Sequence, residues 1–233
     1  MPFKVKIAKI IETYNTVLNV VDNQARNSED RAYGGVIRSV KGKLQEYITE
    51  ELIKIAWIES GGEINRLLID SRKHRIKINN DYIEKITDTE IKEHILANIN
   101  NYYYGISVDK QVYVDMEFVL GIECKAYTEN AMIKRILVDF TFLKSMFPDI
   151  NCYLFQLESQ LGGDFSFLDI KTFGSKSTHT IMSYFEDIEL NIVTLLKGER
   201  KVKKPIHKFF KPLPEATLIK AVELLKMDLI KYV

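Results

Sequence analysis

The sequence is poor in cysteine, proline and tryptophan, and it carries almost no net charge. Its 233 residues include 2 Cys, 5 Pro and 1 Trp. Cys124 and Cys152 each lie inside an apolar run, so we expect two reduced core thiols and no disulfide framework. With 33 basic against 32 acidic residues the formal net charge is +1, which excludes a global field that attracts polyanions. Any contact with nucleic acid must therefore come from local basic patches.

Long apolar runs are also missing. No run approaches the roughly 20 residues that a membrane span requires, and lysines interrupt the apolar residues of the N-terminal MPFKVKIAKIIETY. We therefore expect a cytoplasmic protein with no membrane partner. The chain shows no internal repeat and no low-complexity tract. What it does contain is 46% hydrophobic and 11% aromatic residues, enough for one sizeable core.

The spacing of the apolar residues predicts helices in the first half of the chain. Helical periodicity favours a first helix over 3–21, a second over 43–60 that ends at Gly61 and Gly62, and a third around 81–100. The segment between the first two, with its paired glycines, is expected to be a polar break. Residues 64–79 are crowded with basic side chains and are expected to be a strand pair or an extended segment.

The second half of the chain alternates between strand and helix patterns. Residues 112–120 and 121–127 are short and β-rich, and we expect them to form a hairpin joined at Gly121. Thr128 is a good N-cap for a helix over about 129–147 that ends at Pro148. The remaining expected elements are a strand at 150–159, a glycine-containing loop at 160–179, a helix near 179–197, a basic linker and a C-terminal helix from about 214.

This order predicts an α/β fold with a mixed central β-sheet flanked by helices. We expect one domain over residues 1–233, with a core at about 36–160. The first helix, 3–21, and the C-terminal segment, 197–233, are expected to be additions to that core.

Charged side chains occur on the predicted hairpin where the neighbouring residues call for burial. Asp115, Glu117, Glu123 and Lys125 lie among Val, Tyr, Phe, Leu and Ile. Glu123 and Lys125, two residues apart on a strand, share one face, and Asp115 on the partner strand is expected to lie alongside them. Burying such charges is costly unless a divalent cation compensates, and carboxylate oxygens suit Mg²⁺. The pattern therefore predicts metal-assisted phosphodiester hydrolysis, although an isolated E-x-K on a strand is more often a solvated ion pair.

Asp115, followed after seven residues by Glu123-Cys124-Lys125 and then by a helix from Thr128, resembles the PD-(D/E)xK nuclease core, the fold of most type II restriction endonucleases. The stretch RSVKGKLQEYITEEL is similar to the first core helix of such enzymes, and Glu46 matches its glutamate. The resemblance spans about 36–160. It implies a restriction-endonuclease-like core, in which Asp115, Glu123 and Glu46 hold Mg²⁺ (or Mn²⁺ as a substitute) and Lys125 positions the attacking water.

For two of the expected metal ligands the sequence leaves more than one candidate residue. Asp115 follows a valine where the family pattern has proline, and Glu117 shares its strand face, so either acid can be the ligand. On a helical wheel Glu46 lies opposite the apolar stripe, whereas Glu51 falls nearer to it, and Glu50 is a further competitor.

Basic and polar side chains in several stretches are candidates for DNA contacts. Residues 66–77 form one basic stretch, although charge runs are more often solvated faces. His179 has no second histidine or cysteine at ligand spacing, so a zinc site is discarded. The predicted DNA-binding residues are Arg31, Arg38, Lys41, Lys43, Lys134, Arg135, Gln160, Lys176, His179, Lys201, Lys203 and Lys204.

The resemblance implies a Mg²⁺-dependent, site-specific endonuclease acting on double-stranded DNA. Two alternatives stay open: a structure-specific repair or junction-resolving nuclease, and a DNA-binding subunit without catalysis. A double-strand break is most simply made by two twofold-related sites, so we expect a homodimer, with a heterodimer as the alternative. The first and last helices, each with an apolar stripe, offer material for a subunit contact, although these stripes can equally cover the protein's own sheet.

Overall fold

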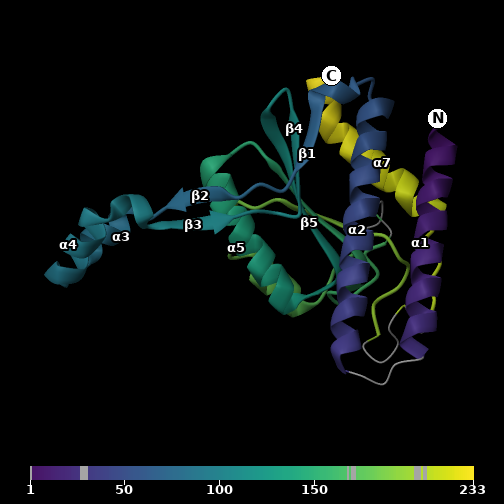
Figure 1. The fold of residues 1–233 in the computed structure, drawn as a ribbon, viewed down its shortest axis with the longest axis horizontal. Coiled ribbons are helices and arrows are strands. Elements are labelled where there is room, and N and C mark those ends of the chain that lie inside the picture. Colours follow the sequence, from purple (N-terminus) through teal and green to yellow (C-terminus); the bar gives the residue numbers. More distant parts are fainter. Residues whose placement is uncertain (1, 27–30, 167, 169–171, 202–205, 207–208) are drawn as a thin grey trace.

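The computed structural model describes the chain except for residues 1, 27–30, 167, 169–171, 202–205 and 207–208, and the side chains of residues 22–38 also lie outside the description (Figure 1). Its centre is a five-stranded sheet in the order β1-β4-β5-β6-β7. The strands are β1 Leu67–Asp70, β4 Lys110–Val114, β5 Glu117–Glu129, β6 Asn151–Gln160 and β7 Leu190–Thr194.

The sheet is mixed, as the sequence predicts. β1, β4 and β5 are antiparallel neighbours, whereas β5, β6 and β7 run parallel. Parallel strands need a crossover connection, and helix α5, Asn130–Met146, supplies it between β5 and β6. The predicted fold class, a mixed sheet flanked by helices, is confirmed.

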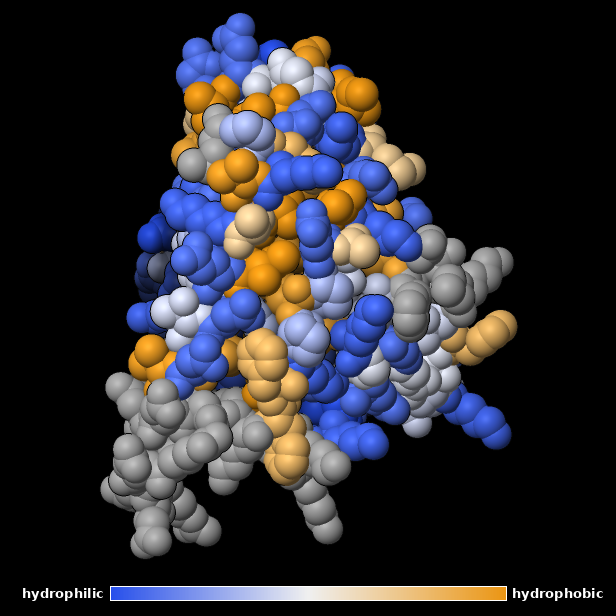
Figure 2. All heavy atoms as spheres, turned by 90° about the vertical axis from the view of Figure 1, so that its right-hand side faces the viewer, coloured by the Kyte–Doolittle hydropathy of each residue, from blue (hydrophilic) through white to orange (hydrophobic). Residues whose placement is uncertain are grey.

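Three helices cover one face of the sheet. They are α1 Phe3–Arg26, α2 Arg31–Glu59 and α7 Glu215–Leu229, and Figure 1 shows them side by side. The apolar stripe of α7 is buried in this core, as are Ile7, Ile10, Tyr14 and Leu18 of α1. Figure 2 looks at the side of the molecule on which α1 lies and shows mainly hydrophilic side chains, with hydrophobic ones in separate areas. Both stripes thus cover the protein's own sheet.

The opposite face of the sheet is covered by α5 and the short helix α6, Lys176–Met182. Gly121 lies in the middle of β5, under α5. A Cβ atom at this position would stand 3.1 Å from the ring of Phe140, so the missing side chain permits the close approach of helix and sheet. This glycine therefore serves packing and not a turn.

The predicted hairpin exists, but its turn was placed wrongly. β4 and β5 are joined by Asp115 and Met116, whose φ angles are 48° and 69°. A two-residue turn with positive φ at both positions matches the twist of paired strands, and aspartate tolerates this region better than most residues. The hairpin therefore turns six residues before Gly121.

Four details of the predicted helices were also wrong. Residues 179–197 are not one helix, because α6 ends at Met182 and β7 follows. Thr128 lies in β5, and the residue before α5 is Glu129, whose side chain makes no capping hydrogen bond. The expected polar break after the first helix is much shorter, since α1 extends to Arg26 and α2 begins at Arg31. The helices around 81–100 are two, α3 Asn80–Lys85 and α4 Thr89–Ala97, and Asp88 caps the second.

An arm projects from the body of the protein. Strands β2, His74–Lys77, and β3, Tyr103–Ile106, form a separate antiparallel ribbon with α3 and α4 at its end (Figure 1). The expected extended segment 64–79 thus contains two strands, β1 and β2, which pair with different partners. The short 3-10 helices are Ile64–Arg66, Ile99–Asn101 and Ile230–Tyr232. Among the residues that the structure describes, no helix is both long and apolar enough to cross a bilayer.

Candidate active site

Two carboxylates and a lysine meet where β4 begins beside β5. Lys110 pairs with Ile122, so Asp109 lies next to Glu123. The Lys125 Nζ atom is 3.1 Å from Asp109 Oδ2 and 3.3 Å from Glu123 Oε1, and the backbone N–H of Cys124 donates to Asp109 Oδ2 at 2.8 Å. Cys124 belongs to the core that faces α2. Because side chains alternate along a strand, Glu123 and Lys125 lie on the α5 face. The cluster therefore combines acceptor and donor groups on one side of the sheet.

The two carboxylates of this cluster have opposite pKa shifts. Burial, together with a hydrogen bond and charge repulsion from Asp109, raises the pKa of Glu123. Burial alone would also raise the pKa of Asp109, but the hydrogen bond from Glu123, the charge of Lys125 and the Cys124 N–H bring it below the ordinary value. Each of two carboxylates this close disfavours the ionised form of the other. Glu123 is therefore the carboxylate of this pair that takes up a proton more readily.

Lys125 stays charged in this environment. Burial acts to lower the pKa of its ammonium group, but the charges of Glu123 and Asp109 and their hydrogen bonds raise it above the ordinary value. A protonated lysine cannot remove a proton from water. It can donate hydrogen bonds to a water or to a phosphate oxygen, which is the role that the chemistry of this site permits.

The expected position of Asp115 beside Glu123 and Lys125 was wrong. Asp115 lies in the hairpin turn, where its carboxylate forms an ion pair with Arg66 at 2.7 Å and is largely exposed. Glu117, the competitor, is also exposed and lies at the start of β5. Six residues of strand separate Glu117 from Glu123, which corresponds to about 20 Å. Asp109 occupies the position in the cluster that the sequence had assigned to Asp115.

Glu46 lies on α2, at the other face of β5. Burial raises the pKa of the Cys124 thiol, and the charges of Asp109, Glu123 and Glu46 add to the rise. Helix α2 packs against β5. The competitors have other partners: Glu50 binds Lys54 and Lys110, and Glu51 binds Lys54.

Sequence reasoning missed two acids near Lys125. Asp109 is one, although SVDKQVYVDMEF shows an acid on each side of the β4 segment. The other is Asp139 on α5. Burial raises the pKa of this carboxyl, and the charges of Arg135 and Lys125 offset only part of the rise. A hairpin turn placed at the polar residues between VYV and FVL would have brought Asp109 to Glu123. No local signal indicates Asp139, because its position depends on how α5 packs.

The donor set fits a divalent cation bound through few protein ligands. Among the described residues no group of three His, Cys, Asp or Glu side chains stands at metal-binding distances. Asp109 and Glu123 provide two carboxylates, and Mg²⁺ commonly uses one or two carboxylates together with waters and substrate phosphates. Two carboxylates this close repel each other, and a cation between them would relieve that repulsion. Both cysteines are free and buried, as predicted, and burial raises the pKa of the Cys124 thiol, so a thiolate nucleophile is unsuitable here.

Those of the predicted DNA-binding residues that the structure describes are dispersed over α2, α5, β6, α6 and the stretch after β7. Gln160, which accepts a hydrogen bond from Arg200 at 2.7 Å, is paired with Glu129 at the end of β5. Thr178 of α6 donates to the side chain of Asn130 at 2.7 Å, so the first turns of α5 and α6 meet near this end. Exposed side chains in these regions are Lys134, Arg135, Lys176 and His179.

The other candidates lie elsewhere. Lys43 is exposed on α2, Lys41 is half-buried there, and Lys201 is exposed between β7 and α7. Arg31, Arg38, Lys203 and Lys204 have side chains outside the described part of the structure. All twelve stay predictions.

A mixed sheet between helical layers, with an E-x-K strand and an aspartate from its neighbour, is the architecture of a restriction-endonuclease-like nuclease. The chain is 53% identical over 230 residues to the type II restriction enzyme DdeI of Desulfomicrobium norvegicum, and the match covers 96% of each chain. No protein-family model and no solved structure matches it. The chain therefore belongs to the type II restriction endonucleases, which are site-specific deoxyribonucleases.

Proposed function

We propose that the protein cleaves both strands of DNA at a specific site, with Asp109, Glu123 and Lys125 as its catalytic residues and Mg²⁺ as its cofactor. The observation that carries this proposal is the contact of Lys125 Nζ with both carboxylates on one face of β5. The family relationship supports the reaction class and makes a repair nuclease or a non-catalytic subunit the weaker reading. Because the proposed substrate is DNA, we also propose that the protein is cytoplasmic.

Each residue of the cluster has a role that follows from its charge and position. Asp109 and Glu123 would hold the cation, and the Cys124 N–H keeps the Asp109 carboxylate in place. When bound, Mg²⁺ (or Mn²⁺) polarises the scissile phosphate and makes a water more acidic. The Lys125 ammonium group donates hydrogen bonds to the attacking water and to the phosphate oxygen on which charge develops.

Cleavage is expected to require Mg²⁺ or Mn²⁺. Ca²⁺ is expected to support DNA binding with little cutting, because its larger and more flexible coordination sphere does not keep the octahedral geometry of Mg²⁺. The measurement is incubation of the purified protein with genomic DNA and each metal, followed by electrophoresis. A ladder of discrete fragments with Mg²⁺ supports the proposal; a smear, or equal cutting in EDTA, contradicts it.

We retain Glu46 as a further residue of the site, which supports the water or a second cation at the sheet edge. Its place on α2, the helix that packs against β5, supports this role. Glu46→Gln is expected to lower the cleavage rate by about 10-fold or more, in the range of residues that support metal ligands. Glu51→Gln, on the same helix and paired with Lys54, is the control and should have a smaller effect. A larger defect in Glu51→Gln would show that Glu46 was assigned wrongly.

We also propose that two copies of the chain act together, because one cluster of this kind cuts one strand and a twofold arrangement presents two clusters to a palindromic site. Since the stripes of α1 and α7 are buried within the chain, the subunit contact must use other surfaces.

Light scattering is expected to give twice the 27.1 kDa of one chain, at least when the DNA that it cuts is present. The same sample should convert supercoiled plasmid to the linear form without accumulating a nicked form. A chain that stays monomeric with and without DNA, or that only nicks one strand, would overturn the homodimer and indicate a second, different subunit.

A further inference from the structure

The projecting β2–β3 ribbon carries one strongly basic face. In β2 the exposed side chains are Arg75 and Lys77. Lys73, two residues before Arg75, is also exposed and lies on the same face. Neither the segment 71–80 nor β3 contains an acidic residue. Within the described parts of the chain, none of these three cations forms an ion pair with a carboxylate. The face therefore offers three uncompensated positive charges to a partner.

Aromatic side chains lie among these cations. The Arg75 guanidinium stands 4.4 Å from the ring centre of Tyr103, and Tyr103 is opposite Lys77 in the ribbon. Opposite Arg75 is Gly105, where a Cβ atom would be 3.8 Å from the Lys73 side chain. Because Gly105 has no side chain, none stands beside Arg75 on the neighbouring strand. Cations interleaved with an aromatic ring on a flat ribbon are suited to phosphates and bases.

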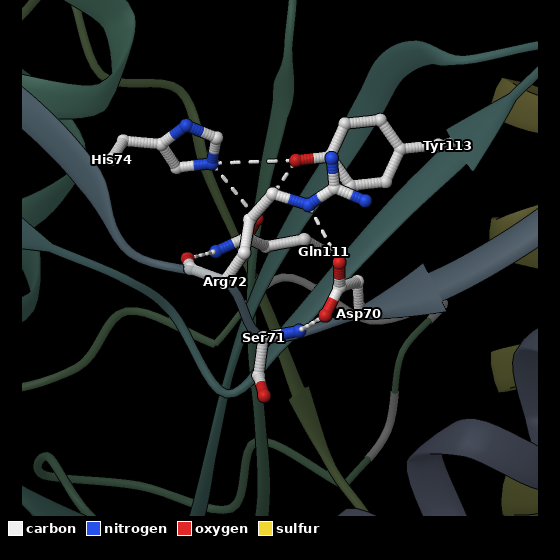
Figure 3. A network of polar contacts seen from close by, with 6 residues as sticks. All are labelled: Asp70, Ser71, Arg72, His74, Gln111 and Tyr113. Carbon is white, nitrogen blue, oxygen red and sulfur yellow. Dashed lines mark hydrogen bonds and ion pairs between the residues drawn. The ribbon is translucent and has the colours of Figure 1, made fainter.

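The base of the ribbon is fixed to the central sheet by a polar network (Figure 3). The buried Gln111 of β4 donates to the Arg72 carbonyl at 2.7 Å, and its Oε1 atom lies 2.8 Å from Tyr113 Oη and 2.9 Å from His74 Nε2. The Arg72 guanidinium lies over the Tyr113 ring and binds Asp70 at 2.6 Å. The ribbon is thus held in a defined direction relative to β4.

The same ribbon leads directly into the catalytic cluster. β3 ends at Ile106, and only Ser107 and Val108 precede Asp109. Because consecutive Cα atoms are about 3.8 Å apart, Tyr103 lies at most about 23 Å from Asp109. At about 3.4 Å per base pair this corresponds to no more than about seven base pairs along a duplex. A four-residue ribbon is about 13 Å long, and the major groove, about 12 Å wide, admits a two-stranded ribbon.

We propose that the β2–β3 ribbon is a DNA-binding arm that lies in the major groove next to the cleaved phosphate, with Lys73, Arg75 and Lys77 contacting phosphates and base edges. The proposal rests on the nuclease function proposed above. It assigns DNA recognition to part of the basic stretch 66–77 and not to the twelve individually predicted residues. Asp109 and Glu123, which would hold the cation, lie at the base of the arm, while the network of Gln111 sets the arm's angle.

The test is a variant that carries Lys73→Gln, Arg75→Gln and Lys77→Gln together. Its binding to a labelled duplex that contains the cut site is measured in Ca²⁺ at a series of salt concentrations. Each lost phosphate contact lowers the slope of log K against log salt by about 0.9, so we expect a decrease of between about 1 and about 3, and binding at least about tenfold weaker at moderate salt. Cleavage in Mg²⁺ should slow at subsaturating DNA.

The matched control removes three charges from α1, on the opposite side of the body, by Lys4→Gln, Lys6→Gln and Lys9→Gln (Figure 1). It should keep the wild-type slope to within about 0.5, because long-range charge effects are screened beyond about 10 Å. Circular dichroism should show both variants folded. A ribbon variant with the wild-type salt slope and cleavage rate would contradict the DNA-binding arm but not the proposed nuclease function. If that variant instead changed only the mass in light scattering, the ribbon would be a subunit contact. A wild-type protein that cuts no DNA would overturn both proposals.

Discussion

Replacing Asp109 by asparagine is expected to abolish DNA cleavage, whereas Asp115→Asn should leave it near the wild-type rate. Asp109 is next to Glu123 and Lys125, and the amide keeps its shape but removes the charge that would hold the cation. Loss of a metal ligand costs several kcal/mol of transition-state stabilisation, so we expect a decrease on the order of 10³-fold in single-turnover rate. Asp115 binds Arg66 at the exposed turn, far along the strand.

The two variants form a matched pair because each changes one aspartate of the same hairpin into its amide. Thermal unfolding should be recorded for both. The Asp115–Arg66 ion pair is exposed to solvent, so Asp115→Asn is expected to change the unfolding temperature little. If Asp115→Asn were inactive while Asp109→Asn cut DNA normally, the assignment of the site by strand register would be wrong.

Replacing Lys125 by alanine is expected to lower the cleavage rate on the order of 10²- to 10³-fold, the cost of removing a donor aimed at developing charge. DNA binding in Ca²⁺ should change by no more than a few-fold, because Lys125 is one of many cations. The fold should survive, since Glu123 and Asp109 can share a proton when the ammonium group is absent.

Lys54→Ala is the control for this variant. Lys54 also contacts two carboxylates, Glu50 and Glu51, and its side chain is 38% exposed against 31% for Lys125. It should cut DNA at close to the wild-type rate. Equal losses of activity in the two variants, or an unfolded Lys125→Ala protein by circular dichroism, would make the Lys125 contacts structural and not catalytic.

Much of the fold could be predicted because local patterns and tertiary structure agree. The helical spacing of apolar residues in the first and last segments predicted α1 and α7. In the structure the apolar stripe of each helix packs into the core under the sheet. The short β-rich runs became β4, β5 and β6 in a mixed sheet. Glu123 and Lys125 could be identified as partners because residues two apart on a strand share a face whatever the strand pairs with. Their ion pair at 3.3 Å follows from this local rule.

The acid that completes the cluster could not be chosen from the chain alone. Which residue of β4 lies beside Glu123 depends on the position of the hairpin turn, and a turn moved by six residues exchanges one aspartate for another. Glycine favours turns in general, but at Gly121 it is needed for the approach of Phe140, while Asp115 and Met116 adopt positive φ. Strand register and helix packing are long-range properties, so only the folded sheet brings Asp109 to Lys125 and aims the basic ribbon from the same edge.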